Sequence, residues 1–186
     1  MSKLKGILLT QGMHGMISQV EGLAKALDLD FTHHTVEPNS FWKVIPPKLT
    51  PISQNVYNKI NHEEFDVIIS CGRKSVIPSI HLKNTANKKT FNIHIQDPKV
   101  DLNHFDFVVV PEHDSLNGQN VISTKGAIHY LTENEISENK DYLKSFIKND
   151  ERKIWTLIMG GPNKYYDYST KNMKHIFISL YKLLKK

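Results

Sequence analysis

Residues 6–27, GILLTQGMHGMISQVEGLAKAL, join a short apolar run, a glycine turn and a helical pattern. The run GILLT (6–10) is typical of a buried strand, and residues 17–27 place their apolar side chains on one helical face. The same order recurs at FDVIISC (65–71), which precedes another glycine turn and a helical pattern over 72–84. Strands that alternate with helices predict parallel βαβ units with helices on both faces of the sheet.

The rest of the first 135 residues continues this alternation, so we expect an α/β, Rossmann-like parallel sheet domain over 1–135. Further strands are expected at 31–36, 90–95, 105–114 and 120–129. The proline-rich stretch 38–51 is typical of an irregular loop, and 56–60 of a short helix. Pro78 lies inside the pattern at 72–84, so that helix either breaks there or begins later than the pattern suggests.

A second unit of the same kind is expected near the end of the chain. KIWTLIMGG (153–161) has the composition of a buried strand, and 169–184 of an amphipathic helix with Ser169 or Thr170 as its N-cap. Residues 136–152 are polar and are expected to form a linker or connecting helix. One strand and one helix do not make a domain, so we expect 153–186 to be the incomplete start of a second Rossmann-like domain.

Composition excludes several classes of protein. The chain has 186 residues, 39% of them hydrophobic, and one cysteine. These values exclude a disordered chain, a disulfide scaffold and a cysteine-based zinc cluster. No apolar run reaches the roughly 18 residues of a membrane-spanning helix, and residues 1–10 lack the pattern of a secretory signal. We therefore expect a cytoplasmic protein.

The net charge of +5 is concentrated near the end of the chain. Residues 151–186 hold eight of the 24 Lys and Arg residues but two of the 19 Asp and Glu residues. Arginine is the usual reader of bases and phosphates, and Arg73 and Arg152 are the only two here. We therefore expect no nucleic-acid partner, and Arg73 becomes the side chain most expected to have a function.

Ligands of parallel α/β sheets bind beyond the carboxyl ends of the strands, where this chain carries its most distinctive residues. The first turn contains Gly12, His14 and Gly15, which suit a close backbone approach or a simple tight turn. The second turn, Gly72-Arg73-Lys74-Ser75, suits a phosphate or carboxylate, although solvated side chains and a helix cap are the alternative. A helix terminus beside Cys71 would lower the pKa of its thiol, whereas packing is the more frequent role of a lone cysteine.

Polar clusters follow the next two expected strands. Gln96 and Asp97 come after one of them, and Glu112, His113 and Asp114 after the other. His94 with Asp97, or the second cluster by itself, suits a general-base pair, and the alternative is that the acids cap turns. The spacing matches no metal signature, so we expect no metal site.

Two further glycine turns repeat the theme nearer the end of the chain. Lys125-Gly126 follows one expected strand, and Gly160-Gly161 follows another. Tyr165, Tyr166 and Tyr168 come next, and suit either stacking on a base or sugar or packing between domains.

Five segments together resemble one known family. They are GMHGMISQVEGLAKAL (12–27), GRKSVIPSIHLKN (72–84), IHIQDPKVDLNHFDFVVVPEHD (93–114), GQNVISTKGAIH (118–129) and LIMGGPNKYY (157–166). The chain is thus similar to the mitochondrial-fission "elongated mitochondria" family, whose bacterial members are regarded as glycosyltransferases of the two-domain GT-B fold. The stretch 93–114 is the most specific of the five.

The resemblance implies a metal-independent transfer of a sugar from a nucleotide-sugar donor to a cell-envelope or lipid-linked acceptor. No cofactor is implied beyond the nucleotide sugar, which is a substrate. Most of this chain would be the acceptor half, and Gly160 and Gly161 would begin the donor side. A His, Asp or Glu would deprotonate the acceptor hydroxyl, which makes His14, Asp97 and Glu112 the candidate catalytic residues. The candidate substrate-binding residues are Gly12, Gly15, Gln19, Gly72, Arg73, Lys74, Ser75, Gln96, His113, Asp114, Lys125, Gly126, Gly160 and Gly161.

Other functions remain open on the sequence alone. One alternative is a non-catalytic binding or scaffold protein on a degenerate GT-B fold, as the plant members' role in organelle division suggests. A weaker one is a nucleotide-sugar epimerase of similar form. A peripheral contact with the inner membrane, through the apolar loop 38–51 or the basic helix at 169–184, is a further expectation.

Overall fold

The computed structural model describes residues 3–61, 64–144, 155–160 and 167–185. The chain divides into two compact units, Met1–Lys140 and Asp141–Lys186. The domain boundaries expected from the sequence, at 135 and 153, remain predictions.

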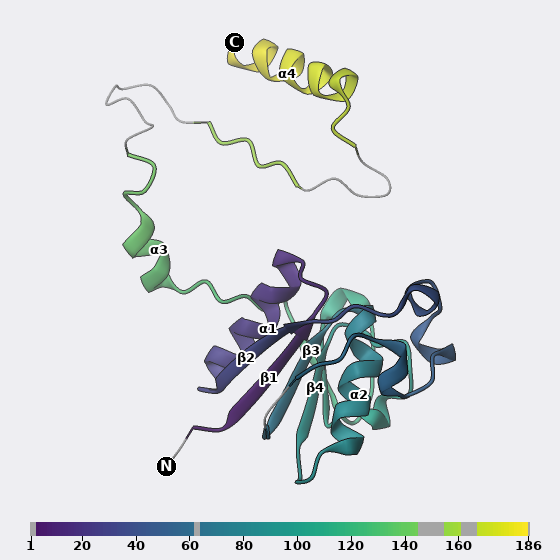
Figure 1. Ribbon diagram of the computed structural model, residues 1–186. Helices are drawn as coiled ribbons and strands as arrows, with labels where there is room; N and C mark the ends of the chain where they lie inside the picture. Colours follow the sequence, from purple (N-terminus) through teal and green to yellow (C-terminus); the bar gives the residue numbers. More distant parts are fainter. Residues whose placement is uncertain (1–2, 62–63, 145–154, 161–166, 186) are drawn as a thin grey trace. The chain divides into compact units, whose positions relative to one another are not determined.

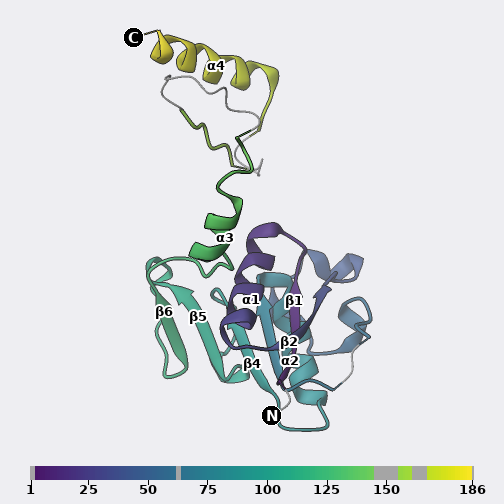
Figure 2. The ribbon, with the colours of Figure 1, turned by 90° about the vertical axis from the view of Figure 1, so that its left-hand side faces the viewer.

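The first unit is built on a six-stranded sheet in which every neighbouring pair is parallel. Its strands are β1 (Lys5–Thr10), β2 (Asp30–Thr35), β3 (Val67–Cys71), β4 (Phe91–Ile95), β5 (Phe107–Pro111) and β6 (Val121–Thr124). They lie in the order β2-β1-β3-β4-β5-β6, and Figure 2 shows β5 and β6 extending the sheet beyond β4. The expectation of an α/β, Rossmann-like fold is therefore confirmed.

Two helices cover opposite faces of this sheet (Figure 1). Leu8 and Ile69 face α1 (His14–Ala26) and pack with its Val20. The alternate residues of the same strands pack on the other face with α2 (Val76–Thr85). Because strands buried on both faces need apolar side chains on both, the strands appear in the sequence as continuous apolar runs.

The helix expected over 72–84 begins late, because a turn precedes it. Residues Arg73–Ser75 form a 3₁₀ turn, and α2 begins at Val76. Pro78 is therefore the third residue of the helix, in the first turn, where a missing N–H breaks no helical hydrogen bond. Of the two outcomes expected for Pro78, the later start is the one observed.

Two further helices lie toward the end of the chain. The helix α3 (Glu133–Asn139) begins with a capping box between Thr132 and Glu135. This helix overlaps the start of the linker or connecting helix expected at 136–152, whereas residues 141–144, which include Tyr142 of the expected weak helix, form a turn and residues 145–152 are outside the described residues. The helix α4 (Thr170–Leu184) has Ser169 as its N-cap, since the Ser169 hydroxyl accepts from the Asn172 N–H, as predicted.

Two details of the prediction are wrong. Residues 155–160 of the strand expected at 153–161 form no strand, and the Ile158 side chain is 88% exposed. A buried strand needs neighbours to pair with, and no strand occurs among the described residues of this unit. Residues 56–60 form no helix either; the turn Gln54–Val56 ends there. The segment 105–114 is a strand followed by a turn, as expected, since β5 ends at Pro111 and a 3₁₀ turn over Glu112–Asp114 follows.

The long connection between β2 and β3 is closed at its base. Pro38 and Tyr57 form an isolated antiparallel bridge. The Asn39 N–H donates to the Val56 carbonyl at 2.9 Å, and the Asn39 side-chain amide donates to the Asn55 carbonyl at 2.6 Å. We call residues 38–57 the closed loop. Long loops whose ends meet in this way are frequently functional.

Candidate functional site at the carboxyl edge of the sheet

The carboxyl ends of β1 and β3 meet where the strand order reverses direction. From β1 the chain passes to β2 on one side, and then returns to β3 on the other. In open parallel sheets this switch point is the usual place for a ligand. The predicted turns at Gly12 and Gly72 follow β1 and β3, so the structure brings both of them to the switch point.

Both of these glycines have backbone angles that other residues rarely adopt. The φ angles of Gly12 and Gly72 are +79° and +89°. A Cβ at Gly72 would lie 2.7 Å from the Gln11 Nε2 atom and 2.8 Å from the Met16 sulfur. The backbone conformation therefore favours glycine at both turns, whereas the contacts at Gly72 are the ends of flexible side chains that can move aside.

A buried hydroxyl supports the first turn. The Thr10 Oγ1 atom, which is fully buried, accepts from the Gly12 N–H at 3.0 Å and lies 2.8 Å from the His33 Nε2 atom. Burial lowers the pKa of His33, which favours its neutral imidazole ring. The Nε2 atom of this neutral ring shares a hydrogen bond with the Thr10 hydroxyl, and the tautomer decides which of the two donates. Thr10 thus joins the turn after β1 to the edge strand β2.

We expect Thr10→Val to lower the free energy of unfolding by about 1 kcal/mol, because an isosteric side chain loses both hydrogen bonds. Urea unfolding monitored by circular dichroism measures the change. Thr32→Val is the control, since that exposed hydroxyl has a single, longer contact of 3.5 Å to His34. Equal effects of the two substitutions would contradict a supporting role for Thr10.

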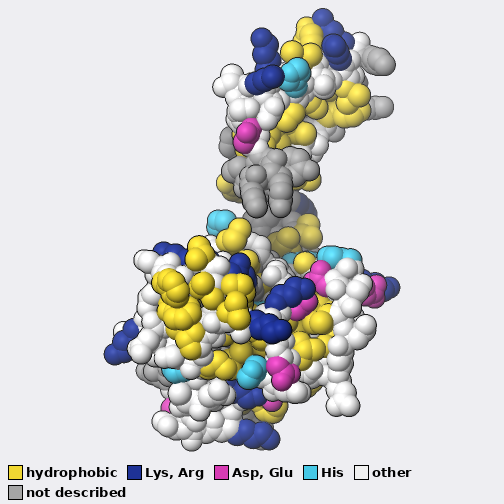
Figure 3. Space-filling view, turned by 90° about the vertical axis from the view of Figure 1, so that its right-hand side faces the viewer, with side chains coloured by type: hydrophobic (Ala, Val, Ile, Leu, Met, Phe, Trp, Pro, Cys, Tyr) yellow, Lys and Arg dark blue, Asp and Glu magenta, His cyan; other side chains and the backbone are white. Residues whose placement is uncertain are grey.

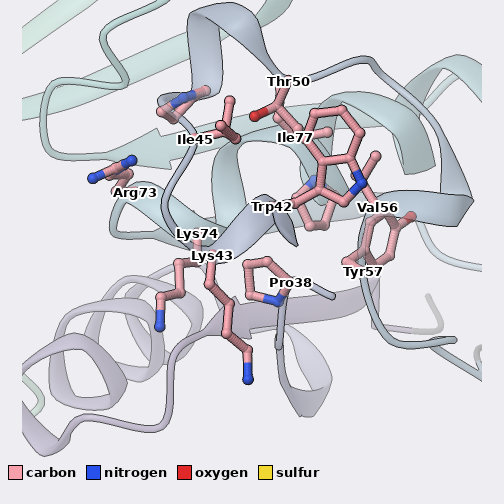
Figure 4. Close-up of a pocket in the computed structure, with 12 residues that line it drawn as sticks. Pro38, Trp42, Lys43, Ile45, Thr50, Val56, Tyr57, Arg73, Lys74 and Ile77 are labelled. Carbon is pink, nitrogen blue, oxygen red and sulfur yellow. The ribbon is translucent and has the colours of Figure 1, made fainter. Parts of the chain in front are cut away.

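One hollow at this edge lies between the closed loop and the start of α2, and we call it the Trp42 pocket (Figure 4). It is a shallow hollow: its volume is about 340 Å³ when the open solvent at its mouth is included, and about 30 Å³ of this is space that a water-sized molecule can occupy. One wall comes from the closed loop, with Pro38, Trp42, Ile45, Val56 and Tyr57. The opposite wall comes from Arg73, Lys74, Ile77 and Pro78.

The cations of the Trp42 pocket point in two directions. In Figure 4, Lys43 and Lys74 extend to the same side, whereas Arg73 points elsewhere. The Arg73 Nη2 atom donates to the Val44 carbonyl at 3.3 Å, which ties the closed loop to the turn after β3. Arg73, the expected functional side chain, therefore lines a pocket and also holds its wall.

A second hollow lies farther along the edge and combines several of the predicted residues. Of these, Gln19, Gln96, Asp97, His113 and Asp114 line it, together with Lys99, Pro111 and Ala127. We call it the Asp97 hollow. The sequence correctly placed these residues near one another, although they belong to α1 and to the segments after β4 and β5.

Asp97 is engaged by its neighbour Lys99. Its carboxylate accepts from the Lys99 N–H at 2.9 Å and from the Lys99 ammonium at 2.5 Å. Partial burial by itself would raise the pKa of Asp97, but the hydrogen bonds from Lys99 outweigh it, and the pKa is lowered. An ionised and paired Asp97 fits the turn-stabilising alternative, and its role as a base remains a prediction.

The backbone beside Asp97 is strained. Gln96 has a φ of +84°, which is rare for a residue with a side chain. Its N–H donates to the Val109 carbonyl at 2.9 Å, which holds it against β5. Such strain is frequent where a loop positions a functional group.

The four residues expected to share one cleft are distributed along the edge. Arg73 lines the Trp42 pocket and Asp97 lines the Asp97 hollow, whereas His14 and Glu112 line neither. His14 is the exposed first residue of α1, and Glu112 is exposed in the turn after β5. His113 Nε2 lies 3.6 Å from the nearer carboxylate oxygen of Asp114.

Burial decides between the alternatives for two groups. His94 is fully buried with its Nδ1 atom 2.8 Å from the Ser70 hydroxyl, and desolvation lowers its pKa to about 3, so the pairing of His94 with Asp97 as an accessible base is wrong. Burial raises the pKa of the Cys71 thiol to about 12, so Cys71 has the packing role expected of a lone cysteine and not the lowered pKa of the alternative.

Several candidate ligand groups have other roles or surroundings. The Ser75 hydroxyl is buried and donates to the Cys71 and Gly72 carbonyls at 2.9 and 2.8 Å, so it caps the turn. Gly15, Gly126 and Gly160 have open space where a Cβ would lie, so sterics do not require glycine there. Lys125 is exposed after β6. Gly161, Tyr165 and Tyr166 lie outside the described residues.

The described residues contain neither a cluster of metal-binding side chains nor a helix that could span a membrane. No group of three or more His, Cys, Asp or Glu side chains within ranges 3–61, 64–144, 155–160 and 167–185 is placed to hold a metal ion. In those same ranges, no helix combines the length and apolar character needed to cross a bilayer.

The sequence predicted an irregular loop over 38–51 but not that this loop forms the Trp42 pocket with α2. The contact of Tyr57 with α2, where the Tyr57 hydroxyl lies 2.9 Å from the His81 Nδ1 atom, joins residues that are far apart in the chain. Burial raises the pKa of Tyr57 to about 12. The one available signal was an aromatic and aliphatic loop framed by prolines at Pro38, Pro46, Pro47 and Pro51.

Comparisons with known proteins point to a single family. The family model described as Mitochondrial fission ELM1 matches residues 14–186. The "Mitochondrial fission protein ELM1" of Arabidopsis thaliana is 35% identical over 48 residues, which cover 26% of this chain and 11% of that protein. The alignment therefore spans about a tenth of the length of this relative. No solved structure matches the chain.

Proposed function

The chain belongs to the mitochondrial fission ELM1 family, and from this premise we propose that it acts in glycosyl transfer of the GT-B type. In this proposal a sugar moves from a nucleotide-sugar donor to a lipid-linked or cell-envelope acceptor, without a metal ion or cofactor. The Met1–Lys140 unit binds the acceptor at the carboxyl edge of its sheet.

One observation carries the proposal: an exposed imidazole and cations outside any ion pair lie along the same edge of the sheet, where parallel sheets bind ligands, although they do not line one pocket. His14 is exposed at the start of α1, directly after β1. Among the ion pairs of the described residues, none involves Arg73 or Lys74. A base and unpaired cations are the groups that a metal-independent transfer needs.

The proposed reaction assigns a step to His14. The acceptor hydroxyl oxygen attacks the anomeric carbon of the donor sugar, and the bond from that carbon to the diphosphate breaks. The hydroxyl proton passes to the His14 imidazole as the oxygen becomes nucleophilic. Glu112 and Asp97 are the second candidates, of which Glu112 is exposed and Asp97 is paired with Lys99.

Release of nucleoside diphosphate tests this function. The intact protein is mixed with a panel of UDP-, GDP- and ADP-sugars and with a lipid extract as the acceptor. We expect one donor to release its nucleotide at a rate that depends on the extract, and mass spectrometry to find the glycosylated lipid. If the protein binds the donor or the lipid but releases nucleotide from no donor, this result would contradict the proposal and support the non-catalytic alternative.

A further inference from the structure

We propose that the Trp42 pocket binds the phosphate head of a membrane lipid, and that exposed apolar side chains beside it enter the lipid surface. The inference deepens the proposed function by naming the chemistry of the acceptor. It rests on that function only in identifying the bound lipid as the acceptor, because the binding itself requires no transfer.

The charge of the pocket favours an anion. Lys43 and Lys74 extend to the same side of the pocket (Figure 4), and no acidic residue lines it. No ion pair among the described residues involves either lysine. Two ammonium groups on the same side of a pocket, without a carboxylate partner, favour an anionic ligand such as a phosphate.

The inner part of the pocket favours hydrocarbon over a nucleobase. The Tyr57 hydroxyl is already bound to His81, and the Thr50 hydroxyl donates to the Pro46 carbonyl at 3.0 Å. Other walls are aliphatic, from Ile45, Val56 and Ile77. A base would bury polar edges with few groups to pair with them, which is costly, whereas an acyl or prenyl chain loses no hydrogen bonds.

The surface beside the pocket is apolar and exposed. Phe41, Val44 and Leu49 are 67%, 75% and 71% exposed, and all three belong to the closed loop. The space-filling view from this side shows hydrophobic side chains gathered next to Lys and Arg (Figure 3). Exposed apolar side chains beside cations are typical of proteins that bind the surface of an anionic bilayer.

The closed loop presents these groups in a fixed arrangement. The Pro38–Tyr57 bridge and the hydrogen bonds of Asn39 close its base, and Arg73 holds its middle through the Val44 carbonyl. Trp42 packs against the buried core under the loop. Because little chain entropy is lost on binding, a preorganised loop binds more tightly than a mobile one.

Tryptophan fluorescence tests the proposal. Trp155→Phe leaves Trp42 as the single tryptophan, and this variant is titrated with phosphatidylcholine vesicles with or without phosphatidic acid. We expect a shift of Trp42 emission to shorter wavelength, and sedimentation with the vesicles, when phosphatidic acid is present. Equal binding to pure phosphatidylcholine would overturn the proposal.

A charge-matched pair of variants identifies the site. In the same background, Lys43→Gln with Lys74→Gln is expected to weaken vesicle binding about tenfold or more, because each basic side chain near an anionic surface contributes substantially. Lys59→Gln with Lys89→Gln removes two exposed charges outside the pocket and outside the basic helix, and is expected to leave binding nearly unchanged. Equal weakening by both pairs would show a general charge effect and overturn the site.

Soluble ligands separate the possible sources of the phosphate. A short-chain phosphatidic acid below its micelle concentration is expected to shift Trp42 emission, whereas inorganic phosphate or UDP at the same concentration is not. UDP that binds as tightly as the lipid would overturn the proposal in favour of a nucleotide site. Binding without sugar transfer would keep this inference and contradict the proposed function, so the two failures are distinguishable.

Discussion

Replacing His14 with alanine is expected to lower the rate of sugar transfer about 100-fold or more. A positioned general base accelerates proton transfer by about 10² to 10⁴, and His14 is the exposed imidazole at the switch point of the sheet. The measurement is kcat from nucleotide release with saturating donor and acceptor. The shift of Trp42 emission by lipid is expected to persist, because His14 does not line the Trp42 pocket.

His175→Ala is the matched control, because that imidazole is exposed on α4. It is expected to keep full activity. Full activity of His14→Ala would contradict the assignment of His14, and a large loss with Glu112→Gln would then transfer the role of base to Glu112. Circular dichroism spectra of the three variants must match the parent, since a misfolded protein also loses activity.

Acid is expected to destabilise the first unit through His94. Desolvation lowers the pKa of this buried imidazole from 6.5 to about 3, so the unfolded chain binds a proton that the folded protein excludes. The stability is fully present above about pH 6.5 and is lost as the pH falls. Linkage gives a loss of about 1.4 kcal/mol for each pH unit, or about 2 to 3 kcal/mol between pH 6.5 and 4.5.

Urea unfolding of the parent and of His94→Leu at pH 7 and pH 4.5 isolates this effect. Leucine removes the titrating group and also the Nε2 atom, which is buried without a hydrogen-bond partner. Lowered pKa values at Asp66 and Asp97 add their own acid sensitivity to both proteins, so the difference between the two slopes reports His94. Parallel slopes for parent and variant would contradict the prediction.

The sheet was predictable because its signal is local. Strands such as 65–71 are buried on both faces, so their side chains are apolar without alternation, and the glycine turns after them mark the carboxyl edge. Pro78 indicated that the helix over 72–84 is either broken or begins late, and the structure decides for the late start. Gln96, Asp97 and His113 were named as polar residues after two strands, and they line one hollow because neighbouring parallel strands end at the same edge.

The remaining features depend on contacts that no local pattern records. The pKa of Cys71 depends on such contacts, because the helix terminus and burial shift it in opposite directions and the complete burial of the thiol decides the result. The Trp42 pocket needs the closed loop to pack on α2, a contact between segments about 20 to 30 residues apart. The strand expected at 153–161 has an apolar run but no neighbouring strand among the described residues.

The bridge between Pro38 and Tyr57 fixes the two ends of the closed loop between β2 and β3. Between these ends the loop contacts the rest of the unit through Trp42, which packs against the core, and through the Val44 carbonyl, which accepts from Arg73. Lengthening such a loop costs little additional closure entropy. Changes at its exposed positions, such as Phe41 and Leu49, can therefore alter what relatives recognise while the sheet that carries His14 keeps its register.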